Sequence, residues 1–92
     1  MDKNYSLDRL FDAILTLKTK DECSEFFADA CTPKELQAIA QRFTVAEMLY
    51  NMRVYSAIIE VTGASTATIS RVSRSINSGY KMAFERLKQS NE

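Results

Sequence analysis

The sequence contains no histidine, only two glycines and one proline, and no apolar run long enough to cross a membrane. It also has no metal-ligand spacing, no glycine-rich phosphate loop and no nucleophile beside a recognisable base. We therefore expect neither an enzyme nor a metal or cofactor site. The scarcity of glycine and proline, together with 46% apolar residues, favours long helices with more apolar surface than one small core needs.

No positively charged start followed by an apolar segment is present, which predicts a cytoplasmic protein that is not bound to a membrane. The two cysteines, Cys23 and Cys31, are eight residues apart. On one continuous helix this separation is about 12 Å, which exceeds the Cα distance that a disulfide tolerates. Both are expected to be reduced, buried thiols.

The formal net charge is zero, but the charges are unevenly distributed. Residues 1–60 carry seven Lys/Arg and ten Asp/Glu, a net charge of −3. Residues 61–92 carry five Lys/Arg and two Asp/Glu, a net charge of +3. The zero net charge by itself argues neither for nor against a nucleic-acid partner, but the chain is acidic in its first two thirds and basic in its last third.

Apolar periodicity and capping signals predict six helices in a single all-α domain spanning residues 1–92. Thr19 and Glu22 have the spacing of a capping box at the start of the second helix, and Thr32, Pro33 and Glu35 start the third. The apolar faces of the first two helices are formed by Leu7, Leu10, Phe11, Ile14 and Leu17, and by Cys23, Phe26, Phe27 and Ala30.

The third helix is predicted to run from Pro33 to about Tyr50 and to carry two apolar stripes. One stripe comprises Leu36, Ile39, Ala40 and Phe43, and the other Val45, Met48, Leu49 and Met52. A helix that is apolar on two sides is buried on two sides. In so small a protein the second side is expected to meet another subunit, which predicts a homodimer.

Two short helices joined by a tight turn are predicted between about residues 55 and 77. Gly63 ends the first of them because glycine takes a left-handed conformation without Cβ strain, and Ser65 caps the second. Gly79 is expected to end the second helix in the same way. This arrangement is typical of a helix-turn-helix. A last amphipathic helix carries Tyr80, Ala83, Phe84 and Leu87.

The second of these short helices has an unusual solvent face. If Ile69, Val72 and Ile76 face inward, the outward residues are small, hydroxyl-bearing or basic, and no Asp or Glu occurs from 61 to 84. Small hydroxyls allow close approach to a DNA groove, and arginine pairs with guanine or neutralises phosphate. The predicted DNA-binding residues are Ser65, Thr66, Ala67, Thr68, Ser70, Arg71 and Arg74, with Arg53 and Lys81 as possible phosphate contacts.

Two other interpretations remain open. Helix-glycine-helix corners also occur in bundles that never touch DNA, so the chain could be a helical module that binds a protein partner through its third helix. Arg42, in turn, could simply be a surface arginine paired with Glu35 or Glu47.

The stretch from Glu35 to Ser78, and especially GASTATISRVSRSI from Gly63, resembles the tryptophan-repressor superfamily, most closely its YerC/YecD-type branch of bacterial regulators. The resemblance implies a six-helix protomer, an intertwined homodimer, and recognition helices that enter successive major grooves of double-stranded DNA. It implies a sequence-specific transcription regulator that acts as a repressor.

In tryptophan-binding members of this family, the corepressor lies between two arginines, whose positions match Arg42 and Arg71. The resemblance therefore also implies an effector pocket and an amino-acid-gated repressor. These members have a glycine after the second arginine, whereas this chain has Val72, whose branched side chain would occupy space near the ligand. This departure favours a regulator without a tryptophan-like corepressor.

Overall fold

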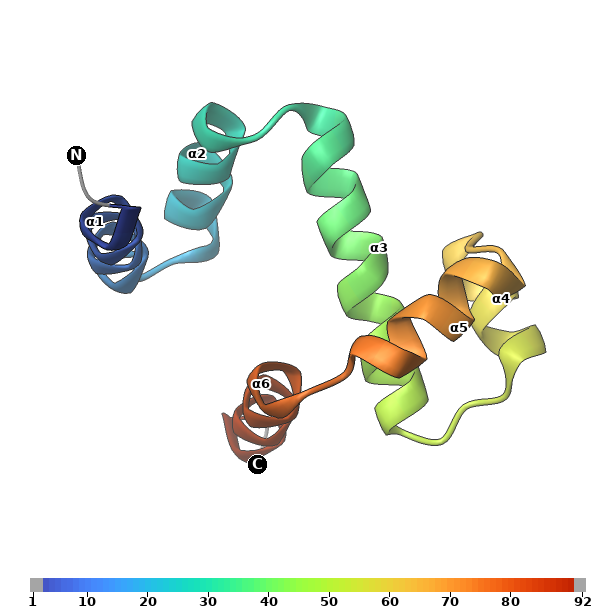
Figure 1. Ribbon diagram of the computed structural model, residues 1–92. Helices are drawn as coiled ribbons and strands as arrows, with labels where there is room; N and C mark the ends of the chain where they lie inside the picture. Colours follow the sequence, from blue (N-terminus) through green and yellow to red (C-terminus); the bar gives the residue numbers. More distant parts are fainter. Residues whose placement is uncertain (1–2, 91–92) are drawn as a thin grey trace. The chain divides into compact units, whose positions relative to one another are not determined.

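The computed structural model describes residues 3–90 and contains six α-helices and no strand within this range (Figure 1). The helices are α1 (Lys3–Leu15), α2 (Lys20–Ala30), α3 (Pro33–Tyr50), α4 (Tyr55–Thr62), α5 (Thr66–Ser75) and α6 (Ser78–Ser90). The predicted all-α, six-helix architecture is confirmed. No helix in the described range combines the length and apolarity that crossing a membrane requires.

The chain divides into two compact units, Met1–Leu36 and Gln37–Glu92, with the division inside α3. We call them the N-terminal unit and the C-terminal unit and describe each by itself. This division does not test the expectation of a single domain over residues 1–92, which stays a prediction.

The helix starts in the N-terminal unit follow from capping. Thr32 and Glu35 form the predicted box: the Thr32 amide donates to Glu35 Oε1 at 2.8 Å, and the Glu35 amide donates to Thr32 Oγ1 at 3.1 Å. At α2 the Glu22 amide donates to Thr19 Oγ1 at 3.1 Å, but Glu22 Oε1 accepts from the Lys18 amide rather than from Thr19. In the capping box at α2, the amide that the Glu22 carboxylate binds is therefore one residue earlier than predicted.

Three predictions about the N-terminal half are wrong in detail. The first helix ends at Leu15, so Leu17 lies in the connection that follows it. Cys23 is exposed and Cys31 is half-buried, although both thiols are free, as predicted. Arg42 is exposed and forms no ion pair with Glu35 or Glu47 in the described part of the chain.

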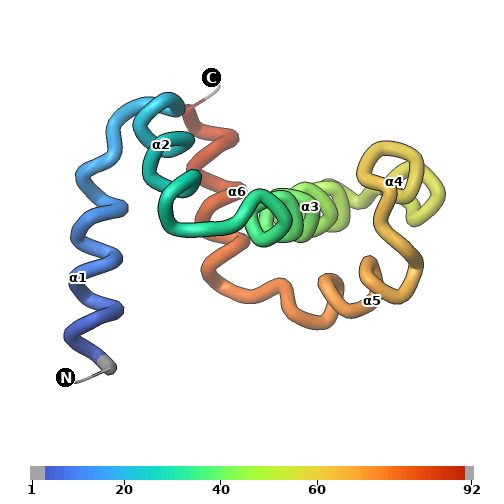
Figure 2. The backbone as a smooth tube through the Cα atoms, turned by 90° about the horizontal axis from the view of Figure 1, so that it is seen from above, coloured from blue at the N-terminus to red at the C-terminus, as the bar shows by residue number. Residues whose placement is uncertain are grey.

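The C-terminal unit contains the hydrophobic core, which gathers side chains from the C-terminal half of α3 and from α4, α5 and α6. Among the residues that the structure describes, seven side chains are buried: Val45, Ala46, Ile58, Ala64, Ile69, Val72 and Phe84. Figures 1 and 2 both show α4 and α5 beside one another near the C-terminal end of α3. The core therefore fixes the two short helices against a long one.

An aromatic cluster attaches α6 to α3. The Phe84 ring centroid lies 5.2 Å from those of Phe43 and Tyr50 and 5.7 Å from that of Tyr80, and the Lys88 ammonium group lies 5.0 Å from the centroid of the Tyr50 ring. Such ring pairs contribute about 0.5–1.5 kcal/mol each beyond their buried area. The last helix is thus part of the core that supports α4 and α5.

Two helix ends depart from the predictions. Gly79 does not end α5: it lies in the first turn of α6, and Gly63 is the only glycine with a positive φ. Instead α5 ends at Ser75, followed by Ile76 in an extended conformation. Met52, predicted on an apolar stripe of the third helix, lies beyond the end of α3 with φ 63°, and 87% of its surface is exposed.

Candidate nucleic-acid interface

The turn between α4 and α5 is built from local hydrogen bonds. Gly63 adopts φ 71°, and its amide donates to the Ile59 carbonyl at 2.8 Å, which ends α4 as predicted. Thr62 Oγ1 donates to the Ile58 carbonyl at 2.7 Å and accepts from the Ala64 amide at 3.1 Å. Because these bonds satisfy the backbone of the turn, the start of α5 is held in a defined position.

The first turn of α5 is capped by Ser65. Ser65 Oγ accepts from the Thr68 amide at 3.1 Å and donates to Thr68 Oγ1 at 3.1 Å. The inward side of α5 is the predicted one, with Ile69 and Val72 buried and Ile76 half-buried just beyond its end. These contacts fix the rotation of α5 about its own axis, so the opposite side faces outward.

The outward side of α5 is polar and basic. Thr66, Ala67, Arg71 and Arg74 are exposed and Ser70 is half-buried. The hydroxyl groups of Ser65 and Thr68 are bonded to each other, whereas those of Thr66 and Ser70 have no partner in the described part of the chain. The face therefore offers two free hydroxyls, one methyl group and two guanidinium groups to a ligand.

The two predicted phosphate contacts lie outside α5. Arg53 is exposed in the connection between α3 and α4, where its amide donates to the Met48 carbonyl at 2.9 Å. Lys81 is exposed near the start of α6, where its amide donates to the Asn77 carbonyl at 3.1 Å. Both side chains belong to the same compact unit as α5.

The two arginines of the suggested effector pocket, Arg42 and Arg71, lie on α3 and α5. Both arginines are exposed, and Val72 retains only 3% of its surface exposed because it belongs to the core. A cavity of about 200 Å³ between α3 and α4 includes neither arginine, and its volume is below the roughly 300 Å³ at which ligand pockets begin. Its wall includes Gln41, whose Nε2 donates to the Thr62 carbonyl at 3.1 Å.

Within residues 3–90 no group of three or more Cys, Asp or Glu side chains could hold a metal ion. In the same range one carboxyl group has a clearly shifted pKa: the hydrogen bonds from the backbone and side chain of Thr32 lower the pKa of Glu35. Glu35 lies at a helix start outside the candidate interface. The shift therefore reflects capping rather than acid–base chemistry.

Sequence reasoning did not anticipate the aromatic cluster or the turn at Met52. The four rings at positions 43, 50, 80 and 84 offered a signal, because each pair within a helix has near-helical spacing. No comparable signal existed at Met52. Glycine and asparagine are the residues that usually indicate a left-handed position.

The fold and this face together define an all-helical protein with a helix-turn-helix in its C-terminal unit. The chain belongs to the Trp repressor protein family, whose model matches residues 5–91. That family consists of DNA-binding regulators that dimerise and is not a family of enzymes. The resemblance found in the sequence is confirmed.

Three relatives place the chain more closely. It is 52% identical over 90 residues to the uncharacterised protein YerC of Bacillus subtilis. The aligned region covers 95% of this chain and 86% of YerC. A TrpR-like protein from Eubacterium eligens has a TM-score of 0.88 and 53% identity, over 94% of this chain and 92% of its own. A candidate Trp repressor from Staphylococcus aureus has a TM-score of 0.86 and 48% identity, and the match covers 91% of this chain and 87% of that protein.

Proposed function

We propose that this protein is a sequence-specific DNA-binding transcription regulator that acts as a homodimer and represses its targets. The recognition element is α5, which would enter the major groove, with Arg53 and Lys81 binding phosphates beside it. As a regulator of chromosomal DNA in a bacterium, it would act in the cytoplasm. It performs no catalysis in this proposal.

The observation that supports this proposal most is the outward face of α5. An ordinary exposed helix is rich in Glu, Lys and Gln, which are good helix formers, whereas this face carries Ser and Thr, which weaken a helix. No acidic residue occurs from 61 to 84. Small hydroxyls and arginines on a face without acids suit a polyanion with readable base edges.

The homodimer is supported by the apolar surface and the charges of the two units. Apolar side chains are exposed along α1, including Leu7, Phe11 and Leu15. The N-terminal unit carries five Lys/Arg and eight Asp/Glu, a net charge of −3, and the C-terminal unit seven and four, a net charge of +3. Units of opposite charge favour association between copies.

We further propose that DNA binding needs no tryptophan-like corepressor. Val72 occupies the position of the glycine found in the tryptophan-binding members, and its side chain fills the core. Calorimetry with a panel of amino acids should therefore give no heat and leave the DNA affinity unchanged. A measurable heat together with tighter DNA binding would instead support the amino-acid-gated repressor, with Arg42 and Arg71 as the pair to mutate.

The decisive experiment is selection of genomic DNA fragments by the purified protein over a salt series, followed by sequencing of the bound fragments. We expect an enriched, roughly palindromic site whose affinity falls steeply with salt, because phosphate contacts release counterions. Weak binding without any enriched site, at low salt and in the presence of amino acids, would contradict the proposal. It would favour the protein-interaction module.

A further inference from the structure

One side-chain hydrogen bond of the C-terminal unit joins residues that are far apart in the sequence. Gln41 on α3 donates from Nε2 to the carbonyl of Thr62, 21 positions later at the end of α4, at 3.1 Å. Within the described residues 37–90, every other side-chain hydrogen bond joins residues no more than four positions apart. The same range contains no side-chain ion pair. The bond from Gln41 is therefore the directional contact between α3 and the helix-turn-helix.

The Thr62 carbonyl needs a partner from outside its own helix. Thr62 is the last residue of α4, and the carbonyls of the last turn of a helix have no amide four residues further on. Both Thr62 and Gln41 are half-buried. A carbonyl that is partly withdrawn from water favours a hydrogen-bond donor from the protein. The Gln41 amide supplies this donor and so caps the C-terminal end of α4.

The position of Thr62 is carried to the start of α5 by three consecutive residues. Gly63 adopts φ 71°, and its amide is bonded to the Ile59 carbonyl. The Ala64 amide donates to Thr62 Oγ1 at 3.1 Å, and the Ala64 side chain is buried. Ser65 follows as the N-cap of α5. Because each of the three residues is held in place, fixing Thr62 against α3 fixes where α5 begins.

The apolar core fixes a different property of α5. Ile69 and Val72 are buried and set the rotation of α5 about its own axis. Apolar contacts are non-directional, whereas a hydrogen bond tolerates only a narrow range of distance and angle. In the described chain α4 and α5 are the helices whose backbones lie close together over several residues, and α3 reaches them through side chains. The Gln41 bond therefore sets the spacing between α3 and the turn.

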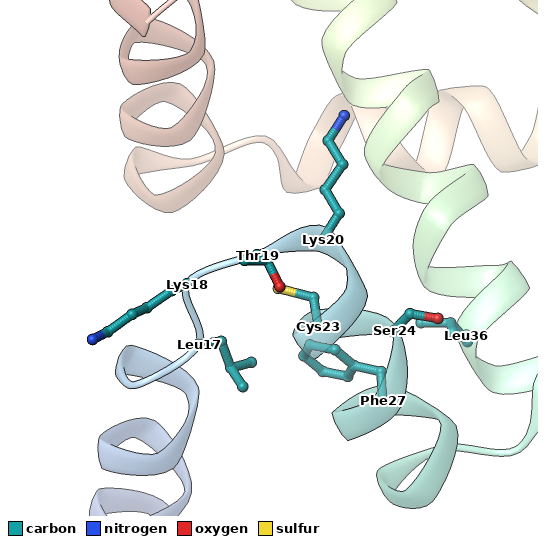
Figure 3. Close-up of a pocket in the computed structure, with 8 residues that line it drawn as sticks. All are labelled: Leu17, Lys18, Thr19, Lys20, Cys23, Ser24, Phe27 and Leu36. Atoms are coloured by element: carbon teal, nitrogen blue, oxygen red, sulfur yellow. The ribbon is translucent and has the colours of Figure 1, made fainter.

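Packing beside this bond is incomplete. A hollow of about 200 Å³ lies between α3 and α4, and its lining consists of Ala40, Gln41, Thr44, Val61 and Thr62. A larger open groove of about 580 Å³, with Leu17, Phe27 and Leu36 in its lining, lies within the N-terminal unit (Figure 3). Of these two, the smaller one is lined by residues of α4. Since side chains do not fill the space there, packing contributes little to the distance between α3 and the end of α4.

We propose that Gln41 is a positioning residue for DNA recognition: its amide holds the turn between α4 and α5 at the distance from α3 that gives α5 its binding orientation. This inference rests on the proposed role of α5 in DNA binding. Without the bond the turn samples further positions, and only the fraction of molecules in the competent position binds tightly. Gln41 itself touches no DNA in this proposal.

The test compares Gln41→Met with Gln37→Met in the full chain. Methionine is unbranched like glutamine and removes the amide donor. Gln37 lies one turn earlier on the same face of α3 and is exposed, so its replacement is the matched control. Gln41→Met should weaken binding to the selected DNA site by up to about fivefold, the value of one hydrogen bond, and Gln37→Met should bind like the wild type. Urea unfolding of both variants verifies that they are folded at the temperature of the binding measurement.

Two further readouts separate positioning from other roles. The slope of log affinity against log salt should equal that of the wild type, because the bound state keeps the same phosphate contacts. Hydrogen exchange without DNA should be faster in Gln41→Met at the Gly63 and Ala64 amides, again by up to about fivefold. The increase at the Lys81 amide of α6 should be smaller, since the lost bond acts on the turn.

Three results for Gln41→Met would overturn the inference. Unchanged DNA affinity would show that the bond does not position α5. A salt slope reduced by about one would make Gln41 a phosphate contact. Exchange that rises equally in the turn and in α6 would give the bond a part in general stability only. If the wild type itself selects no DNA site, the proposed function fails and the inference fails with it, an outcome that is distinct because it needs no variant.

Discussion

Ser65 and Thr68 are bonded to each other twice across the first turn of α5. The Thr68 amide donates to Ser65 Oγ at 3.1 Å, and Ser65 Oγ donates to Thr68 Oγ1 at the same distance. Both hydroxyls are therefore committed to the helix start. Of the residues predicted to bind DNA, Ser65 and Thr68 thus stabilise the start of α5, whereas Thr66 and Ser70 keep free hydroxyls.

The first prediction separates these two roles. Ser65→Ala should lower the free energy of unfolding by about 1 kcal/mol, the usual effect of losing an N-cap. Thr66→Val and Ser70→Ala should leave stability nearly unchanged. Each should lower the preference for the selected DNA site over random DNA about fivefold, since one lost hydrogen bond is worth about 1 kcal/mol. Thermal unfolding and competition binding measure the two effects.

The opposite pattern would count against this division. It would be wrong if Ser65→Ala changed base preference at unchanged stability, or if Thr66→Val and Ser70→Ala left the preference for the selected site unaltered.

The second prediction concerns the arginines of α5. Arg71→Ala and Arg74→Ala should each weaken DNA binding, and a variant that loses a phosphate contact should reduce the slope of log affinity against log salt by about one. The control is Arg86→Ala, an exposed arginine on α6 that lies outside the predicted interface. Affinities equal to that of the wild type in both α5 variants would refute the assignment of these residues.

Much of the helix-turn-helix could be predicted because its signals are local. Gly63 at a left-handed position and Ser65 at an N-cap each act within a few residues, so sequence alone fixes both. The inward side of α5 followed from the spacing of Ile69 and Val72 in the same way. These residues position the candidate interface.

The failed predictions have two different physical causes. Gly79 lies in a helix because the Asn77 carbonyl already accepts from the Lys81 amide, and a glycine by itself does not distinguish a helix end from a helix start. Cys23 was expected to be buried from its place on an apolar face. That face lies in a unit with no buried side chain among its described residues, so the pattern identified the face but not what covers it.

The third prediction contrasts the two glycines. Gly63 has φ 71°, so Gly63→Ala should lower stability by about 1 kcal/mol through Cβ strain, even though no atom lies within 4 Å of the added carbon. Gly79 is helical and also has open space around its Cβ position, so Gly79→Ala should raise stability by up to about 1 kcal/mol. Urea unfolding of the two variants is the measurement. Equal effects of the same sign would contradict the assignment.

The fourth prediction concerns strain at Met52. The Arg53 amide donates to the Met48 carbonyl at 2.9 Å and the Met52 amide to the Leu49 carbonyl at 3.0 Å, so the end of α3 forms a Schellman motif around a left-handed methionine. That conformation costs an L-residue about 1–2 kcal/mol. Met52→Asn should therefore raise the unfolding midpoint, because asparagine tolerates the conformation and the exposed side chain loses few contacts.

Met52→Leu is the matched control, since it keeps both size and strain and should unfold like the wild type. An asparagine variant that is no more stable than the leucine variant would show that Met52 is not strained.

The fifth prediction concerns pH and the start of α3. Hydrogen bonds from the Thr32 backbone and hydroxyl lower the pKa of Glu35 below its ordinary value of 4.5. Because the folded-state pKa is the lower one, the carboxylate stabilises the folded protein above about pH 4.5, and this contribution is lost as the pH falls through the folded-state pKa. Glu35→Ala should accordingly be less stable than the wild type at pH 6, and the difference in stability should narrow at pH 3.

Glu35→Gln keeps an acceptor oxygen without a titrating charge, so its stability relative to Glu35→Ala should hardly change with pH. Unfolding midpoints of the three proteins across this range decide the matter: a gap between wild type and Glu35→Ala that stays constant down to pH 3 would mean that the charge of Glu35 contributes nothing to the cap.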